Sequence, residues 1–134
     1  MEFFATAKVT VSEQELQQQV QIASLPRFCA SIYEVLGDQG EQGEINTLWG
    51  VFRVHREAIC GGVRFTLPGC PNAAAWTVTI DGDRPGEATV HCTINRRQHD
   101  ADFIESLEAF VEDWREGLEA RFTGVDTGAA ARLA

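Results

Sequence analysis

The feature that most constrains the fold is an apolar stripe at helical spacing near the C-terminus. Large apolar side chains recur every three or four residues from Phe103 to Phe122, which is the spacing of one face of an α-helix. Asp102 with Glu105 three residues later is the capping-box pattern that begins a helix, and Gly124 is typical of a glycine cap at its end. The stripe comprises Phe103, Leu107, Phe110, Val111, Trp114, Leu118 and Phe122. A helix with such a face must pack against a second apolar surface.

Four segments of alternating apolar and polar residues are predicted to supply that surface. They span residues 47–57, 59–67, 74–81 and 87–95, with short Gly- and Pro-containing connections between the later ones. Alternation is typical of half-buried β-strands, and short connections favour antiparallel neighbours. The expected sheet core is Phe52, Val63, Phe65, Trp76, Val78, Val90 and Cys92, packed against the helical stripe. The same alternation assigns Trp49 and Val51 to the opposite, outer face.

The N-terminal third is predicted to contain one strand and two short helices. Residues 3–11 are rich in Thr, Val and Phe and indicate a strand. Ser12 with Glu15 forms a second capping box, so a helix begins there. Pro26 ends this helix or opens another, which should stop at Gly37. The second helix is expected to turn Phe28, Cys29, Ile32 and Leu36 inward, and residues 37–44 read as a flexible acidic loop.

These elements predict one domain of the α+β class. One antiparallel sheet of about five strands packs on a long C-terminal amphipathic helix, with a short helical pair after the first strand. A chain of 134 residues suits a single core. The domain is expected to span residues 1–123, and residues 124–134 are expected to form a flexible tail.

Charge and cysteine content restrict the function classes. The chain has a formal net charge of −9 and a sequence pI near 4.7, so its field repels phosphate backbones and argues against nucleic acid. No apolar run approaches the ~20 residues that span a bilayer, and the first residues lack a signal-peptide pattern. Four cysteines in such a chain indicate reduced thiols. These features predict a cytoplasmic protein.

The segment CGGVRFTLPGC, from Cys60 to Cys70, is the strongest candidate for a metal or redox site. A zinc site needs four converging ligands, usually in two close pairs, and the chain contains no C-x-x-C pattern. The alternation instead places the two cysteines at opposite ends of one strand, with the glycine pair marking a bulge or tight bend. We therefore expect free thiols, no metal site and no cofactor.

The outer face of the predicted sheet carries the polar residues Arg53, His55, Arg64 and His91. A Cys–His nucleophile using Cys60 is one interpretation, but no third group or glycine elbow accompanies it. A solvated face, a dimer interface or a partner groove are the alternatives. We assign no catalytic residue, and the sequence favours a binding protein over an enzyme.

The order of elements resembles the helix-grip fold of the START/SRPBCC superfamily. The resemblance covers Phe3 to Phe122 and rests on SLPRF at 24–28, EATVHCTI at 87–94 and ESLEAFVEDWREGLE at 105–119. It implies a sheet that curls around the last helix, although the predicted strands are one or two fewer than this fold usually has. It implies no catalytic residue, because the superfamily has no universal ones. The chain is also similar, more weakly, to secretion chaperones of the Tir-chaperone type, which are acidic homodimers.

Two functions follow as hypotheses. The first is the binding of a hydrophobic small molecule between sheet and final helix, lined by some of Phe65, Trp76, Phe110 and Trp114. The second is an adaptor, secretion-chaperone or immunity-type role, in which the acidic surface binds a basic protein partner. A homodimer is compatible with either hypothesis.

Overall fold

The computed structural model describes residues 1–95 and 100–122 of the chain. The strands are β1 (Glu2–Lys8), β2 (Ile32–Asp38), β3 (Gln42–Thr47), β4 (Gly50–Ile59), β5 (Gly62–Thr66), β6 (Ala75–Ile80) and β7 (Glu87–Thr93). The helices are α1 (Glu13–Gln19), the 3₁₀ turn η1 (Ile22–Ser24), α2 (Leu25–Phe28) and α3 (Ala101–Phe122). The tail predicted for residues 124–134, and the glycine cap predicted at Gly124, lie outside the described residues.

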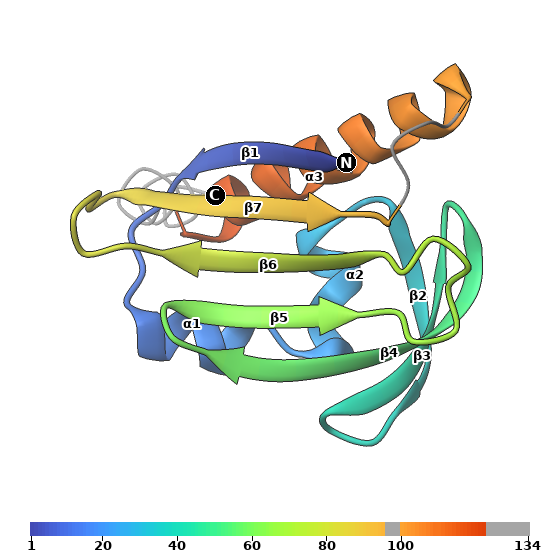
Figure 1. Cartoon of the computed structure of the whole chain (residues 1–134). Helices are drawn as coiled ribbons and strands as arrows, with labels where there is room; N and C mark the ends of the chain where they lie inside the picture. The colour runs from blue at the N-terminus through green and yellow to red at the C-terminus, as the bar shows by residue number, and fades with distance from the viewer. Residues whose placement is uncertain (96–99, 123–134) are drawn as a thin grey trace, which may run out of the picture.

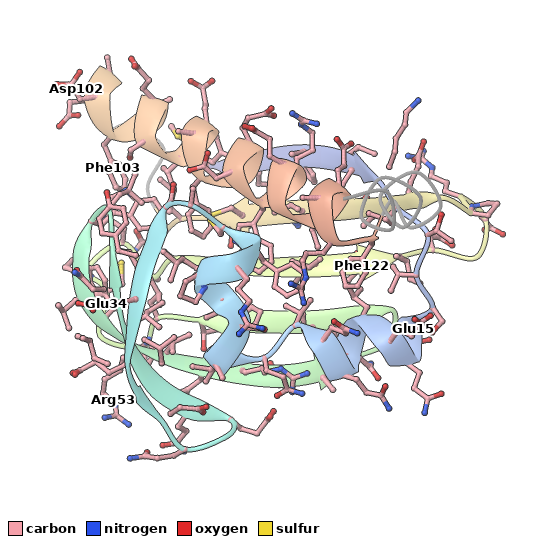
Figure 2. The ribbon with its side chains drawn as sticks, turned by 180° about the vertical axis from the view of Figure 1, so that it is seen from behind. Glu15, Glu34, Arg53, Asp102, Phe103 and Phe122 are labelled. Carbon is pink, nitrogen blue, oxygen red and sulfur yellow. The ribbon has the colours of Figure 1, made fainter. Side chains whose placement is uncertain are left out.

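The described strands form one antiparallel sheet in the order β1-β7-β6-β5-β4-β3-β2. The helices lie on one face of this sheet, behind it in Figure 1 and in front of it in Figure 2. One edge strand, β1, contacts α3, and the other, β2, contacts α2. The sheet therefore curls around the helical layer, as the helix-grip resemblance implies. The predicted α+β class is confirmed, but with seven strands instead of about five.

The two strands that the sequence did not predict are β2 and β3. They occupy residues that were predicted to be a helix and a loop. The predicted second helix is wrong beyond Phe28, because α2 ends there and β2 begins at Ile32. The pairing of β2 with β3 shifts register twice, once at Tyr33 and once at Leu36. Each bulge adds a residue to β2 and leaves its side chain exposed, 58% for Tyr33 and 46% for Leu36. Leu36 therefore points outward, against the prediction.

The N-termini of α1 and α3 are capped by side chains, one at the predicted residue and one not. Ser12 Oγ accepts from the Glu15 N–H at 3.1 Å and Glu15 Oε1 accepts from the Ser12 N–H at 3.2 Å, so the first capping box is confirmed. At α3 the cap is Asp100, whose Oδ1 accepts from the Phe103 N–H at 2.8 Å. The predicted cap, Asp102, lies within the first turn, where a carboxylate also suits the helix N-terminus.

The core lies between the sheet and α3, as predicted. Most of the expected residues are buried: Val63, Phe65, Trp76, Val78, Val90 and Cys92 on the sheet, and Leu107, Phe110, Trp114 and Leu118 on α3. Phe52 and Phe103 are only partly buried, although both pack against this core. The two exceptions lie at the same end of the molecule, beside the hollow described below.

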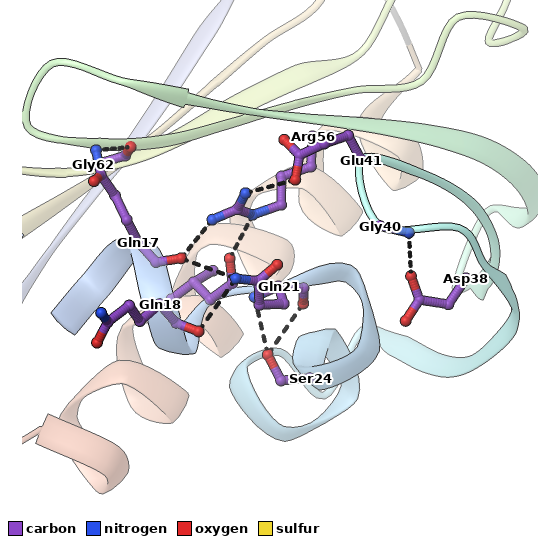
Figure 3. Close-up of polar contacts among 10 residues, drawn as sticks. Gln17, Gln18, Gln21, Ser24, Asp38, Gly40, Glu41, Arg56 and Gly62 are labelled. Carbon is purple, nitrogen blue, oxygen red and sulfur yellow. Dashed lines mark hydrogen bonds and ion pairs between the residues drawn. The ribbon is translucent and has the colours of Figure 1, made fainter. Parts of the chain in front are cut away.

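A buried arginine joins α1 to the sheet (Figure 3). Arg56 of β4 is 7% exposed, and its Nε donates to the carbonyl oxygen of Val20 at 2.8 Å. Its Nη2 donates to the carbonyl of Gln17, and its Nη1 bonds Glu41 Oε1 at 2.8 Å. Carbonyl groups at a helix C-terminus have no partner within the helix. Arg56 therefore provides donors to the end of α1, together with Gln21, whose Nε2 donates to the carbonyl groups of Gln17 and Gln18 at 3.2 Å.

Helix α3 approaches α2 closely at Gly117. A Cβ atom built on Gly117 would lie 1.9 Å from the backbone oxygen of Phe28. In an exposed helix, alanine is more stable than glycine by about 1 kcal/mol. At this position we expect the opposite sign: Gly117→Ala should lower the free energy of unfolding by about 1–3 kcal/mol, because the two helices must separate.

Urea unfolding of the parent and variant measures this effect. The matched control is Gly69→Ala, because a Cβ at Gly69 meets no atom within 4 Å. The control should change the free energy of unfolding by no more than about 0.5 kcal/mol. A stabilised Gly117→Ala variant would contradict the close approach of α2 and α3.

Candidate functional site

The four side chains predicted to line a ligand cavity come together in one aromatic layer. Phe65 and Trp76 project from neighbouring strands, with ring centroids 5.4 Å apart. Trp76 meets Phe110 of α3 edge-on at 4.9 Å, and Trp114 lies 6.2 Å from Phe65. All four are fully buried. The rings pack on one another and fill the space between the sheet and the middle of α3. Ligand binding by these four remains a prediction.

A hollow of about 310 Å³ lies beside this layer, at the N-terminal end of α3. Three parts of the chain form its walls: the start of β4 with its preceding turn, the β5–β6 connection, and the first two turns of α3. The lining residues are Trp49, Phe52, Cys70, Pro71, Asn72, Ala74, Phe103 and Leu107. Figure 2 shows Phe103 beneath the first turns of α3, on the side facing the strands. The structure thus offers an apolar site, but not from the residues first assigned to it.

Trp49 is held in the wall of this hollow by a hydrogen bond and by ring packing. Its Nε1–H donates to Ser106 Oγ of α3 at 2.8 Å. Its ring lies 4.9 Å from Phe110 and 6.3 Å from Phe103, measured between centroids. Because both its polar atom and its ring have partners on α3, Trp49 joins the β3–β4 turn to the helix.

The prediction that Trp49 lies on the outer face is wrong. Residues 47–57 were expected to form one continuous strand, in which Trp49 shares a face with Val51. In the structure Thr47 pairs with Gly50 across a tight turn, so Leu48 and Trp49 form the turn and alternation restarts at Gly50, whose φ is 115°. Val51 lies on the outer face as predicted, 52% exposed. The Trp-Gly pair at 49–50 was the available sign of a turn.

The lining of the hollow is mostly apolar. Among the described residues, its one ionisable side chain is the thiol of Cys70, and its one side-chain amide is that of Asn72. Burial raises the pKa of the Cys92 thiol to about 12, and burial also raises the pKa of Cys29 well above its ordinary value. Both buried thiols are therefore protonated at neutral pH and are poor nucleophiles.

The structure separates the cysteines of CGGVRFTLPGC as predicted. Cys60 is exposed in the turn between β4 and β5, where Gly61 has a φ of 90°, and Cys70 lies after the other end of β5. The glycine pair is thus a tight bend. All four cysteines are free thiols. Within residues 1–95 and 100–122, no group of three or more His, Cys, Asp or Glu side chains is placed to hold a metal ion.

The predicted partner-face residues all lie on the outer face of the sheet, but in separate contacts. His91 Nε2 lies 2.7 Å from Glu2 Oε1, and its ring stacks on Phe4 at 4.3 Å. Arg64 lies two strands away, 3.9 Å from Glu57. Arg53 and His55 are farther along the same face, on β4. Arg53 Nη2 donates to Gln42 Oε1 at 3.5 Å, and His55 pairs with Thr66.

The acidic row of α3 is partly neutralised by one arginine. Arg115 bonds Glu112 and Glu119 on neighbouring turns. The hydrogen bonds that Glu112 accepts from Arg115 lower the pKa of Glu112. Glu105, Glu108 and Glu116 are exposed.

A second hollow, of about 370 Å³, lies at the opposite end of β6. It is lined by Val9, Ile80 and the charged β6–β7 turn, and none of the described lining residues is aromatic. Among the described helices, none is long and apolar enough to cross a membrane.

Comparisons with known proteins identify the fold. No protein-family model matches the chain, and no curated protein matches its sequence. An uncharacterized protein from Bacillus thuringiensis superposes with a TM-score of 0.64 at 14% identity, covering 91% of this chain and 98% of that chain. A START superfamily protein from Mycobacterium smegmatis superposes with a TM-score of 0.60 at 12% identity, covering 90% and 96%. The START-like architecture is therefore confirmed, and at these identities the likeness concerns the fold alone.

Proposed function

We propose that this chain binds a hydrophobic small molecule in the hollow at the N-terminal end of α3. The observation that carries the proposal is the composition of the walls, which include three aromatic side chains, Trp49, Phe52 and Phe103, and the aliphatic side chain of Leu107. A concave site with apolar walls and few polar groups is typical of small-molecule binding. The START-like fold, which curls a sheet around a helix, supports the same proposal.

The proposed function is binding without catalysis. Within residues 1–95 and 100–122, the lining contains one thiol, of Cys70, and no His, Asp, Glu, Lys or Arg side chain. General acid–base or nucleophilic catalysis needs a base within hydrogen-bond reach of the nucleophile. The two histidines that the structure describes, His55 and His91, lie on the outer face of the sheet, on the side away from the helices.

A neutral fluorescent probe, N-phenyl-1-naphthylamine, tests the proposal. We expect one saturable site per chain, seen as a rise in probe fluorescence. A probe concentration one hundred times its dissociation constant should stabilise the fold by about 2.7 kcal/mol. Phe103→Ala removes one wall of the hollow and should weaken binding by about fivefold or more, the effect of losing roughly 1 kcal/mol of apolar contact.

The control variant is Phe4→Ala, on the outer face of β1. Phe4 is 61% exposed, so it is the competing site if the probe merely adheres to surface aromatic rings. Phe4→Ala should leave the affinity unchanged. Absence of saturable binding, or loss of binding in Phe4→Ala with no loss in Phe103→Ala, would refute the proposed site.

A second candidate function rests on the exposed acids of α3. Glu105, Glu108 and Glu116 form an exposed row, and like charges on one helix face repel one another. A basic protein partner would relieve that repulsion, and its capture from a native lysate would weaken as salt rises. Salt-sensitive capture without probe binding favours this adaptor role. A homodimer and a cytoplasmic location stay predictions from the sequence.

A further inference from the structure

Two buried hydrogen-bond donors lie in the aromatic layer without a partner. The indole nitrogens of Trp76 and Trp114 are fully buried, and neither finds an acceptor among residues 1–95 and 100–122. The third indole, of Trp49, donates to Ser106. Buried donors are nearly always paired in folded proteins, and an unpaired one calls for a bound molecule or another explanation. The two orphan donors are therefore candidates for contact with a ligand.

Trp76 is the orphan donor nearer the hollow, behind the residues that line it. Ala74 lines the hollow, and Trp76 follows two residues later on the same inner face of the chain. On α3, Leu107 lines the hollow, and Phe110, one turn later, meets Trp76 edge-on at 4.9 Å. Trp76 thus belongs to the layer directly behind the wall. Trp114 lies a further turn along α3, where it packs on Phe28 at 6.1 Å.

We propose that the ligand of this hollow is a neutral molecule with one hydrogen-bond acceptor, a ketone, ester or ether oxygen, which accepts from the indole N–H of Trp76. The inference rests on the proposed function and specifies its ligand. The apolar body of the ligand lies against Trp49 and Phe103, and the oxygen reaches past Ala74 and Leu107 to Trp76.

A neutral acceptor fits better than a carboxylate. Among the residues that the structure describes, none in the lining of the hollow is cationic, and the chain carries a net charge of −9. A carboxylate buried there would be an unpaired charge, which is far more costly than a buried ketone oxygen that accepts a hydrogen bond. A plain hydrocarbon would fill the hollow but leave the Trp76 donor unpaired.

The test compares two ligands of nearly equal shape, 2-acetylnaphthalene and 2-ethylnaphthalene, which differ in one carbonyl oxygen. The whole chain contains three tryptophans, so ¹⁵N-labelled protein has three indole cross-peaks, assigned with Trp76→Phe and Trp114→Phe variants. Both ligands should shift the Trp49 cross-peak, because Trp49 lines the hollow. Only the ketone should move the Trp76 indole proton downfield, and the Trp114 cross-peak should stay in place.

Affinities measured in the same titrations provide the second readout. The ketone should bind about fivefold more tightly than the ethyl compound, the ratio expected from one neutral hydrogen bond to a buried donor. In Trp76→Phe this difference should vanish, whereas Trp114→Phe, which removes the other buried indole, should retain it. Equal affinities with a shifted Trp49 and an unmoved Trp76 would overturn this inference and leave the proposed function intact. If neither ligand shifts Trp49, both proposals fail.

Discussion

Replacing Trp114 by alanine is expected to lower the free energy of unfolding by about 3–5 kcal/mol, the range for truncating a buried aromatic side chain to alanine. Trp114 is fully buried and packs against Phe28, Phe65 and Trp76, with centroids 6.1–6.4 Å apart. Its removal takes the central ring from the layer between sheet and helix. A loss of this size is a large part of the stability of an ordinary domain, so chemical unfolding should detect it without ambiguity.

The control for this prediction is Phe4→Ala, which removes an aromatic ring from the outer face. Phe4 is 61% exposed and stacks on His91, and its loss should cost about 1 kcal/mol or less. Similar unfolding midpoints for Trp114→Ala and the parent chain would show that the aromatic layer does not form the core.

The second large effect is expected from Arg56→Met. Methionine fills much of the same space but donates no hydrogen bond. The carbonyl oxygen of Val20 therefore loses its donor, and that of Gln17 keeps only the bond from Gln21 Nε2 at 3.2 Å. Each buried acceptor left without a donor costs about 1–3 kcal/mol. We therefore expect the free energy of unfolding to fall by about 2–4 kcal/mol. Urea unfolding of the parent and the variant, followed by far-ultraviolet circular dichroism, measures this change in the free energy of unfolding.

Two further variants identify the source of this effect. Arg53→Met changes an exposed arginine on the same strand and should cost no more than about 0.5 kcal/mol. Glu41→Gln removes the charge that pairs with Arg56, but the Glu41 side chain is 58% exposed, so its loss should cost about 1 kcal/mol or less. A Glu41→Gln variant as unstable as Arg56→Met would show that the ion pair, and not the contact with α1, stabilises the fold.

The elements with regular periodicity were predictable from the sequence. Strands β5, β6 and β7 alternate without interruption, so the inward position of Cys92 and the outward position of His91 follow from parity alone. The stripe of α3 likewise specifies its buried face. In both cases the face on which a side chain lies depends only on residues a few places away in the sequence. The local pattern is therefore enough to predict that face.

Strand β2 shows why other elements were not predictable. Ile32 and Val35 both face the helices although they are three residues apart, because the bulge at Tyr33 adds one residue between them. With Leu36 at the second bulge, the apolar residues fall at the spacing of a helix, and this spacing predicted a helix. The bulges exist only in relation to β3, so no local pattern contains them.

The class of the fold, the aromatic layer and the separation of Cys60 from Cys70 could be predicted from the local pattern of residues. The position of the hollow could not, because its walls come from residues 49–52, 70–74 and 103–107. These segments are brought together by the β3–β4 turn, the β5–β6 connection and the position of α3 on the sheet. Periodicity states which face of an element is apolar. It does not state how far two apolar faces stand apart, and that distance determines whether side chains fill a space or leave it open for a ligand.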